Sequence, residues 1–241
     1  MKKGIVTLLL AAACLPLTSF NYAPSHNTAL ATGLPLPTNT EIISGLKQAL
    51  EQGTLKSATQ LSALNGYFGN AAIKVLMPPE AQKAEKTLRK LGMGKMCDDV
   101  ILSLNRAAED AAKQAAPIFV DAVKQMSVQD AANILTGSND AATQYFKRTT
   151  TAALTAQFKP VVHTSLGKVG ATTLYTQLAT QYNKLPIAFT KVNPNMDDYV
   201  TQKAIDGLFY QIALEELNIR QNLTARTTPL LQKVFGALDK K

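Results

Sequence analysis

The chain has 241 residues, 46% of them hydrophobic, and carries 25 Lys and Arg residues against 17 Asp and Glu residues. Its two histidines and two cysteines form no Glu-x-x-His, His-Glu-x-x-His or Cys-x-x-Cys motif, so zinc and di-iron sites are excluded. We expect neither a metal nor a cofactor. Asp98-Asp99 and Asp197-Asp198 leave an all-oxygen calcium or magnesium site open. Each pair falls at a predicted helix start, however, where compensating the helix dipole is the simpler role.

The first residues have the order of a bacterial export signal, a charged start followed by an apolar run. Lys2 and Lys3 precede the nine residues 5–13. This run is too short to cross a bilayer as a helix, which takes about 20 residues. The tetrad Ala11-Ala12-Ala13-Cys14 resembles the lipobox of bacterial lipoproteins, in which the cysteine is acylated and becomes the mature N-terminus. The alternative is an ordinary cleaved signal that removes Cys14.

A proline-containing segment follows the signal. Residues 19–39 include Pro24, Pro35 and Pro37 and predict a flexible tether. We therefore divide the chain into a signal segment (1–18), the tether (19–39) and a helical domain (40–241). No later stretch has 18 consecutive apolar residues, so an acylated Cys14 would be the membrane anchor. The expected location is the periplasm, with the protein anchored to the outer membrane as a lipoprotein.

Beyond the tether, apolar residues recur at intervals of three and four, the spacing of one buried helix face. This pattern predicts an all-α, single-domain bundle of about eight or nine helices with short connections. Ser127 with Asp130 predicts a helix N-terminus, and Gly137 predicts the end of that helix. In chain order we expect helices over 40–64, 79–91, 98–116, 118–126, 128–136, 145–169, 174–185, 197–219 and 230–235.

Two residues inside these stretches oppose a continuous helix. Gly53 favours an interruption of the first helix. Pro160 predicts a kink or a break in the longest one, because an interior proline removes a hydrogen bond and clashes with the preceding turn. Residues 187–194 are the one place where a short extended segment is expected.

Two kinds of hydrolytic chemistry can be weighed from the residues alone. A Ser-His-Asp triad would have to use His163, the only histidine after the tether, but this residue flanks an apolar stripe and fits a boundary position. A glycosidase needs only two carboxylates, one of them a general acid. Glu109, Asp206, Glu215 and Glu216 lie on predicted apolar helices and are candidates, although their spacing in sequence does not determine their separation in space.

The second predicted helix carries a basic face made by Lys83, Lys86, Arg89 and Lys90. Such a face would meet lipid phosphate groups near a membrane. The alternative is a solvated face with no partner. Nucleic acid is not an expected partner, because the chain is exported and no aromatic residues are interleaved with this basic stretch.

Seven short segments carry a resemblance to a known family: Ser103–Glu109, Pro117–Ala122, Asp140–Phe146, Lys168–Ala171, Tyr182–Pro186, Asp206–Phe209 and Ala225–Thr228. In this order they resemble a bacterial family catalogued as domain of unknown function 4197, whose members carry an N-terminal export or lipoprotein signal. The resemblance covers nearly all of the chain after Thr40. It brings no assigned activity, substrate or catalytic residue.

Polar residues within these segments are the candidates for a site. Asn105 and Glu109 lie one turn apart on one helix face, with Arg106 adjacent. We expect a buried polar network that also includes Asp140, Asp206 and Arg226. Such a network either pins helices together or lines a polar cleft for an anionic or polyol ligand.

Two functions from different classes remain open. The leading hypothesis is a non-enzymatic helical module of the cell envelope that binds a lipid, a peptidoglycan fragment or a partner protein. The alternative is a hydrolase that acts on envelope glycans through paired carboxylates. An acidic cleft would favour the enzyme, whereas an apolar groove rimmed by lysines would favour binding.

Overall fold

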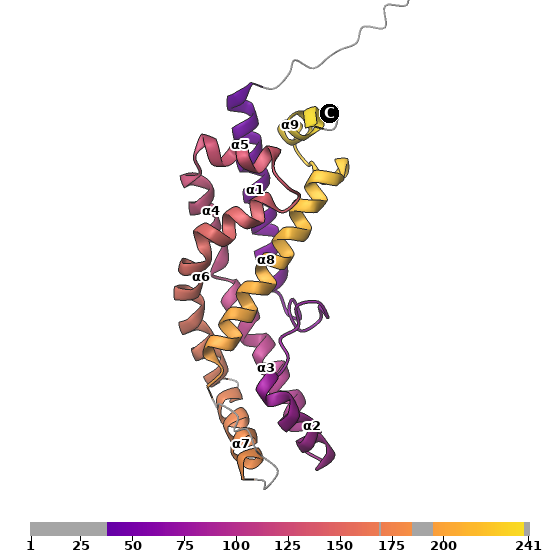
Figure 1. The fold of residues 1–241 in the computed structure, drawn as a ribbon, viewed down its shortest axis with the longest axis vertical. Coiled ribbons are helices and arrows are strands. Elements are labelled where there is room, and N and C mark those ends of the chain that lie inside the picture. The colour runs from indigo at the N-terminus through magenta and orange to yellow at the C-terminus, as the bar shows by residue number, and fades with distance from the viewer. Residues whose placement is uncertain (1–37, 169, 185–194, 239–241) are drawn as a thin grey trace, which may run out of the picture. The chain divides into compact units, whose positions relative to one another are not determined.

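The computed structural model describes residues 38–168, 170–184 and 195–238, and every regular element in these ranges is a helix (Figure 1). The expected all-α class is therefore confirmed. No described helix is both long enough and apolar enough to span a membrane. The signal segment, Cys14, nearly all of the tether and the extended segment expected over 187–194 lie outside the described residues. The elements, with η marking a 3-10 helix, are α1 (Asn39–Ser62), η1 (Pro79–Ala81), α2 (Gln82–Lys90), α3 (Gly94–Ala112), α4 (Ala115–Gln125), α5 (Val128–Thr136), α6 (Ala141–Lys168), α7 (Ala171–Asn183), α8 (Asp197–Gln221), η2 (Leu223–Ala225) and α9 (Pro229–Leu238).

The core lies between the long helices. α1, α3 and α8 contact one another, and α6 packs along both α3 and α8. Phe119 of α4 meets Phe146 of α6 and Phe209 of α8 edge to face, with ring centroids 5.2 and 6.3 Å apart. This geometry is favourable for aromatic rings and joins three helices at one point. α2 and α7 lie at one end of the bundle, and α9 lies against α1 at the other end (Figure 1).

Neither α1 nor α6 is broken at the residue that opposes a continuous helix. α1 runs through Gly53, where a Cβ would meet only Glu215 Cγ and Ile219 Cδ1, at 3.5 and 3.6 Å. α6 runs through Pro160 to Lys168, so the helix does not break there. Phe158 and Val162, on either side of the proline, are fully buried. Their burial compensates for the hydrogen bond that Pro160 cannot make.

Where a capping side chain is present, it marks the residue at which the helix starts. Ser127 and Asp130 form a capping box at the start of α5, and Gly137 follows its last residue, as the sequence predicts. The start of α3 differs from the expectation. This helix begins at Gly94, so Asp98 lies in its second turn, where it pairs with Arg89. A role for Asp98 in compensating the dipole of the first turn is therefore wrong.

Candidate functional site

The segment of residues 63–78, between α1 and η1, is held against α3 by Asn105. The Asn105 side chain is fully buried. Its Oδ1 accepts from the Val75 N–H at 2.8 Å, and its Nδ2 donates to the Val75 carbonyl at 2.8 Å and to the Ile101 carbonyl at 2.7 Å. The Asn105 amide thus supplies hydrogen-bond partners for both the N–H and the carbonyl of Val75, which lies outside any helix.

Glu109, one turn along α3, holds the same segment at a second point. Its Oε1 accepts from the backbone N–H groups of Tyr67 and Phe68, at 3.2 Å each. Its Oε2 pairs with Arg106 Nη1 at 2.5 Å, and Arg106 Nη2 donates to Asn65 Oδ1 at 2.8 Å. The buried carboxylate is therefore neutralised and hydrogen-bonded, which a buried charge requires.

Two tyrosines tie the 63–78 segment to α8. The Tyr67 hydroxyl donates to the Ala204 carbonyl at 2.6 Å, and the Tyr199 hydroxyl donates to the Leu76 carbonyl at 3.1 Å. Burial, together with the nearby Glu109 carboxylate, raises the pKa of Tyr67 far above its ordinary value, so the hydroxyl stays a donor. At Gly207 a Cβ would lie 2.6 Å from the Tyr67 ring, so the close approach of this ring to α8 requires glycine.

A surface groove, named here the α8 groove, lies between this pinned segment and α8. Its volume is about 400 Å³. Two large apolar side chains on it face solvent, Leu76 at 52% exposure and Tyr210 at 43%. Leu214, one turn after Tyr210, is 44% exposed and extends the apolar surface along α8. The groove is lined by Ala72, Ile73, Lys74, Leu76, Met77, Pro79, Gln82, Tyr199, Lys203, Asp206, Gly207 and Tyr210.

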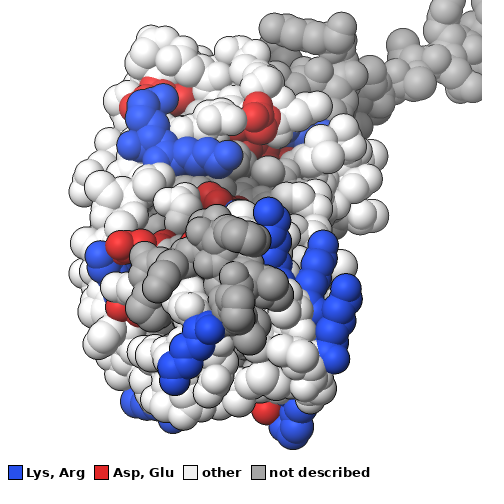
Figure 2. Space-filling model, turned by 60° about the horizontal axis from the view of Figure 1, so that its bottom comes forward, with Lys and Arg blue, Asp and Glu red and all other residues white. Residues whose placement is uncertain are grey.

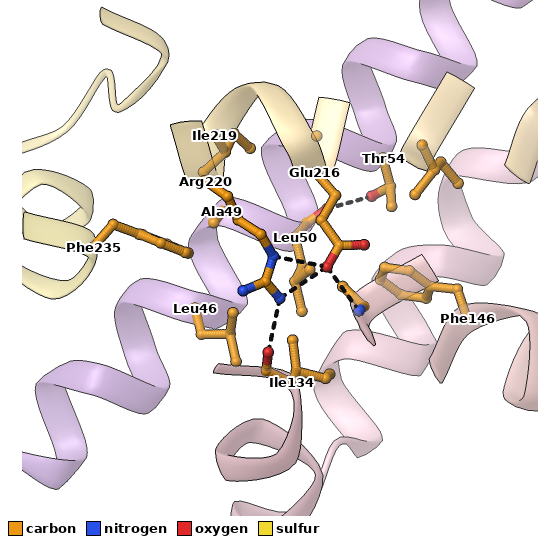
Figure 3. A pocket seen from close by; sticks show the side chains of 13 residues that line it. Leu46, Ala49, Leu50, Thr54, Ile134, Phe146, Glu216, Ile219, Arg220 and Phe235 are labelled. Carbon is orange, nitrogen blue, oxygen red and sulfur yellow. Dashed lines mark hydrogen bonds and ion pairs between the residues drawn. The ribbon is translucent and has the colours of Figure 1, made fainter. Parts of the chain in front are cut away.

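A second cavity lies between α1, α5, α6, α8 and α9 (Figure 3). Its polar residues are committed to internal bonds. Glu216 accepts from the backbone N–H groups of Ala142 and Thr143 at 2.9 Å each, and Arg220 bridges Glu216 to the Ile134 carbonyl. The cavity volume is about 30 Å³, which is room for water rather than for a ligand. Glu216 therefore acts as a cap for the first turn of α6.

The structure distributes the six predicted network residues over several places. Asp206 lines the α8 groove, and Asn105, Arg106 and Glu109 hold the segment that forms its wall. The other two have separate partners in the described contacts. Asp140 accepts from Ser138 and Gln144 just before α6, and the buried Arg226 donates to the carbonyls of Ile219 and Arg220. These contacts do not join all six residues into one network.

The groove residues other than Asp206 were not singled out by sequence reasoning. One signal was present in the sequence. Tyr199, Lys203, Asp206 and Tyr210 recur at three and four, which places them on one face of the predicted helix 197–219. The partner wall, which contains Leu76, lies in a stretch without periodicity and gave no signal.

The basic face of α2 differs from the expectation at one residue. Lys83, Lys86 and Lys90 are exposed on α2. Arg89 instead donates to Glu85 at 2.9 Å and to Asp98 at 2.7 Å. The hydrogen bond to Asp98, followed by that to Glu85, raises the pKa of Arg89 above its ordinary value. The free basic face therefore consists of the three lysines.

Each carboxylate considered for glycoside hydrolysis accepts hydrogen bonds from the protein, and Asp206 Oδ1 accepts from Gln202 Nε2 at 2.9 Å. Lys56 Nζ lies 2.7 and 2.8 Å from the two Glu215 oxygens, Glu216 has Arg220 and backbone N–H groups, and Glu109 has Arg106 and backbone N–H groups. A general acid must instead hold a proton that it can donate. In the ranges that the structure describes, no group of three or more His, Cys, Asp or Glu residues is placed to hold a metal ion.

His163 stands apart from these residues. Its Nδ1 lies 2.8 Å from Asp197 Oδ2, and its side chain is 73% exposed. This exposure agrees with the boundary position expected from the apolar stripe beside it. The pair joins α6 to the first turn of α8, which is a structural role.

The fold and the site define an all-α, multi-helix protein with a surface groove whose wall is pinned from within. The chain belongs to the family described as protein of unknown function (DUF4197), whose model matches residues 36–236. The resemblance stated from the sequence is thereby confirmed. No curated protein and no solved structure matches the chain.

Proposed function

We propose that this protein is an exported, non-enzymatic module of the bacterial cell envelope that binds a partner in the α8 groove. The observation that carries the proposal is the groove wall itself. Asn105, Glu109 and Tyr67 hold a non-helical segment in one position, and that segment presents Leu76 to solvent opposite Tyr210. An exposed apolar surface held in place by buried polar bonds is typical of a binding site.

Three partner classes fit an envelope protein: a lipid, a cell-wall fragment or a partner protein. The lining favours a protein segment. Tyrosines are enriched at the energetic centre of protein interfaces, and Tyr199 and Tyr210 supply two here. Lys74, Lys203 and Asp206 place both signs of charge at the rim, which suits a polypeptide better than an acyl chain.

A photo-crosslinking residue placed at Tyr210 in living cells tests the groove. We expect a protein adduct that disappears when Leu76 on the opposite wall is changed to serine. Leu76 is half exposed, so Leu76→Ser removes apolar surface without opening the core. The matched control is the same crosslinker at Val128, which is 67% exposed on α5. Equal adducts at both positions, or an adduct that Leu76→Ser leaves unchanged, would overturn the proposal.

The location follows from the N-terminal sequence and belongs to the same proposal. Export to the periplasm, with Cys14 acylated and the protein anchored to the outer membrane, is supported by the charged start, the apolar run and the lipobox-like tetrad. Mass spectrometry of the mature N-terminus from the native host decides it. An acylated Cys14 supports the anchor, and a mature chain that begins after Cys14 contradicts it.

A further inference from the structure

A second surface, independent of the α8 groove, lies on α2. Lys83, Lys86 and Lys90 project from one exposed side of this helix, while Ala84 and Leu88 on the other side are buried. The spacing of three and four residues places the lysine side chains in one row. We name these three residues the lysine row.

The ion pairs around α2 leave the lysine row free. Arg89 pairs with Glu85 and Asp98, and Lys95 pairs with Asp99. None of the three lysines takes part in a salt bridge or a cation–π contact with the described residues. Glu85, Asp98 and Asp99 are thus paired with other cations, and Glu80 is the one exposed carboxylate beside the row without an ion pair among the described residues. The row therefore keeps a net positive charge for an external partner.

An exposed apolar side chain adjoins the row. Leu91, the residue after α2, is 61% exposed. A leucine beside lysines is the combination by which helices at membrane surfaces place apolar atoms among lipid headgroups and ammonium groups beside phosphates. Figure 2 shows the face of the molecule at the α2 and α7 end, where basic side chains form several separate groups, some of them beside acidic side chains.

We infer that the lysine row and Leu91 form a docking surface for an anionic phospholipid bilayer. Charge complementarity supports this partner, because lysine is a flexible point charge that suits mobile lipid phosphates. The guanidinium group of arginine is suited to a fixed carboxylate, and Arg89 of α2 is already paired with Glu85 and Asp98. The first residue of α2, Gln82, lines the α8 groove, so a docked bilayer would lie close to the groove.

Co-flotation of the purified protein with vesicles tests the inference. We expect the wild type to bind phosphatidylglycerol-containing vesicles more tightly than vesicles of phosphatidylcholine alone. Lys83→Gln/Lys86→Gln/Lys90→Gln should weaken binding about a hundredfold, since each lysine near an anionic surface contributes about fivefold. Leu91→Ser should weaken binding by a smaller factor. All proteins share one N-terminus, so anchoring by it is common to every sample.

A second triple variant supplies the matched control. Lys113→Gln/Lys124→Gln/Lys147→Gln removes the same charge from other exposed positions and should bind as the wild type does. Equal loss in both triple variants would show a general charge effect and overturn the site. Binding to soluble poly-glutamate but not to the anionic vesicles would overturn the bilayer as the partner.

Discussion

Asn105 binds the backbone of Val75 on both of its polar groups, accepting from the N–H and donating to the carbonyl at 2.8 Å each. The two residues are 30 positions apart, and Asn105 is fully buried. The 63–78 segment forms no helix, so this contact determines where the wall of the α8 groove lies.

Replacement of Asn105 by alanine should destabilise the protein by about 2–4 kcal/mol, because it leaves the buried N–H and carbonyl of Val75 without partners. Chemical denaturation monitored by circular dichroism measures the change. Asn133→Ala is the control, since Asn133 is exposed and should change stability by no more than about 0.5 kcal/mol. A loss below about 1 kcal/mol for Asn105→Ala would show that the amide is not a structural clamp.

Removal of Glu109 should cost more than removal of Arg106. Glu109→Ala leaves the backbone N–H groups of Tyr67 and Phe68 and the Arg106 guanidinium without an acceptor, and we expect a loss of about 3–5 kcal/mol. Arg106 is partly exposed, and its carboxylate partner keeps two backbone donors, so Arg106→Ala should cost about 1–2 kcal/mol. A double-mutant cycle by urea denaturation measures both values and their coupling. The reverse order would contradict the arrangement.

Gly207→Ala should destabilise the protein by about 1–3 kcal/mol, because the new methyl group would lie 2.6 Å from the Tyr67 ring. Gly167→Ala in α6 is the matched control. A Cβ there meets nothing within 4 Å, and alanine should stabilise the helix by about 0.5–1 kcal/mol. Thermal unfolding of both variants gives the comparison, and equal shifts in the same direction would contradict the close packing of Tyr67 on α8.

The link between α1 and α9 should weaken in acid. Hydrogen bonds from Lys233, followed by those from Thr38, lower the pKa of Glu41 from 4.5 to about 2. Because the pKa in the folded state lies below that in the unfolded state, the stabilisation is complete above about 4.5 and is lost as the pH falls toward 2. Protection factors of the amides in the first turn of α1, measured by hydrogen exchange and corrected for the pH dependence of intrinsic exchange, should fall over this window.

Glu41→Gln is the control for the acid effect. The glutamine variant has no carboxylate at this position, so the protection factors of the same amides should be lower at neutral pH and should change less between 4.5 and 2. A wild type whose protection factors are flat over that window would contradict the role of Glu41.

The sequence by itself determined the helices. Their apolar spacing is a local property, and so are the Ser127–Asp130 cap and the turn after Gly137, which the structure reproduces. The shared face of Asn105 and Glu109 was also readable, since two residues four apart on a helix point the same way. The interruption expected at Gly53 and the break considered at Pro160 do not occur, because packing against distant helices outweighs the intrinsic preference of one residue.

Only the tertiary structure decided what the polar residues hold. Asn105 and Glu109 bind a segment that lies 30 to 42 positions before them and has no periodicity of its own. The position of that segment depends on the buried hydrogen bonds of α3 and on Tyr67 packing on α8, none of which local spacing encodes. The α8 groove forms where this segment meets α8, so its residues become neighbours only after the helices have packed.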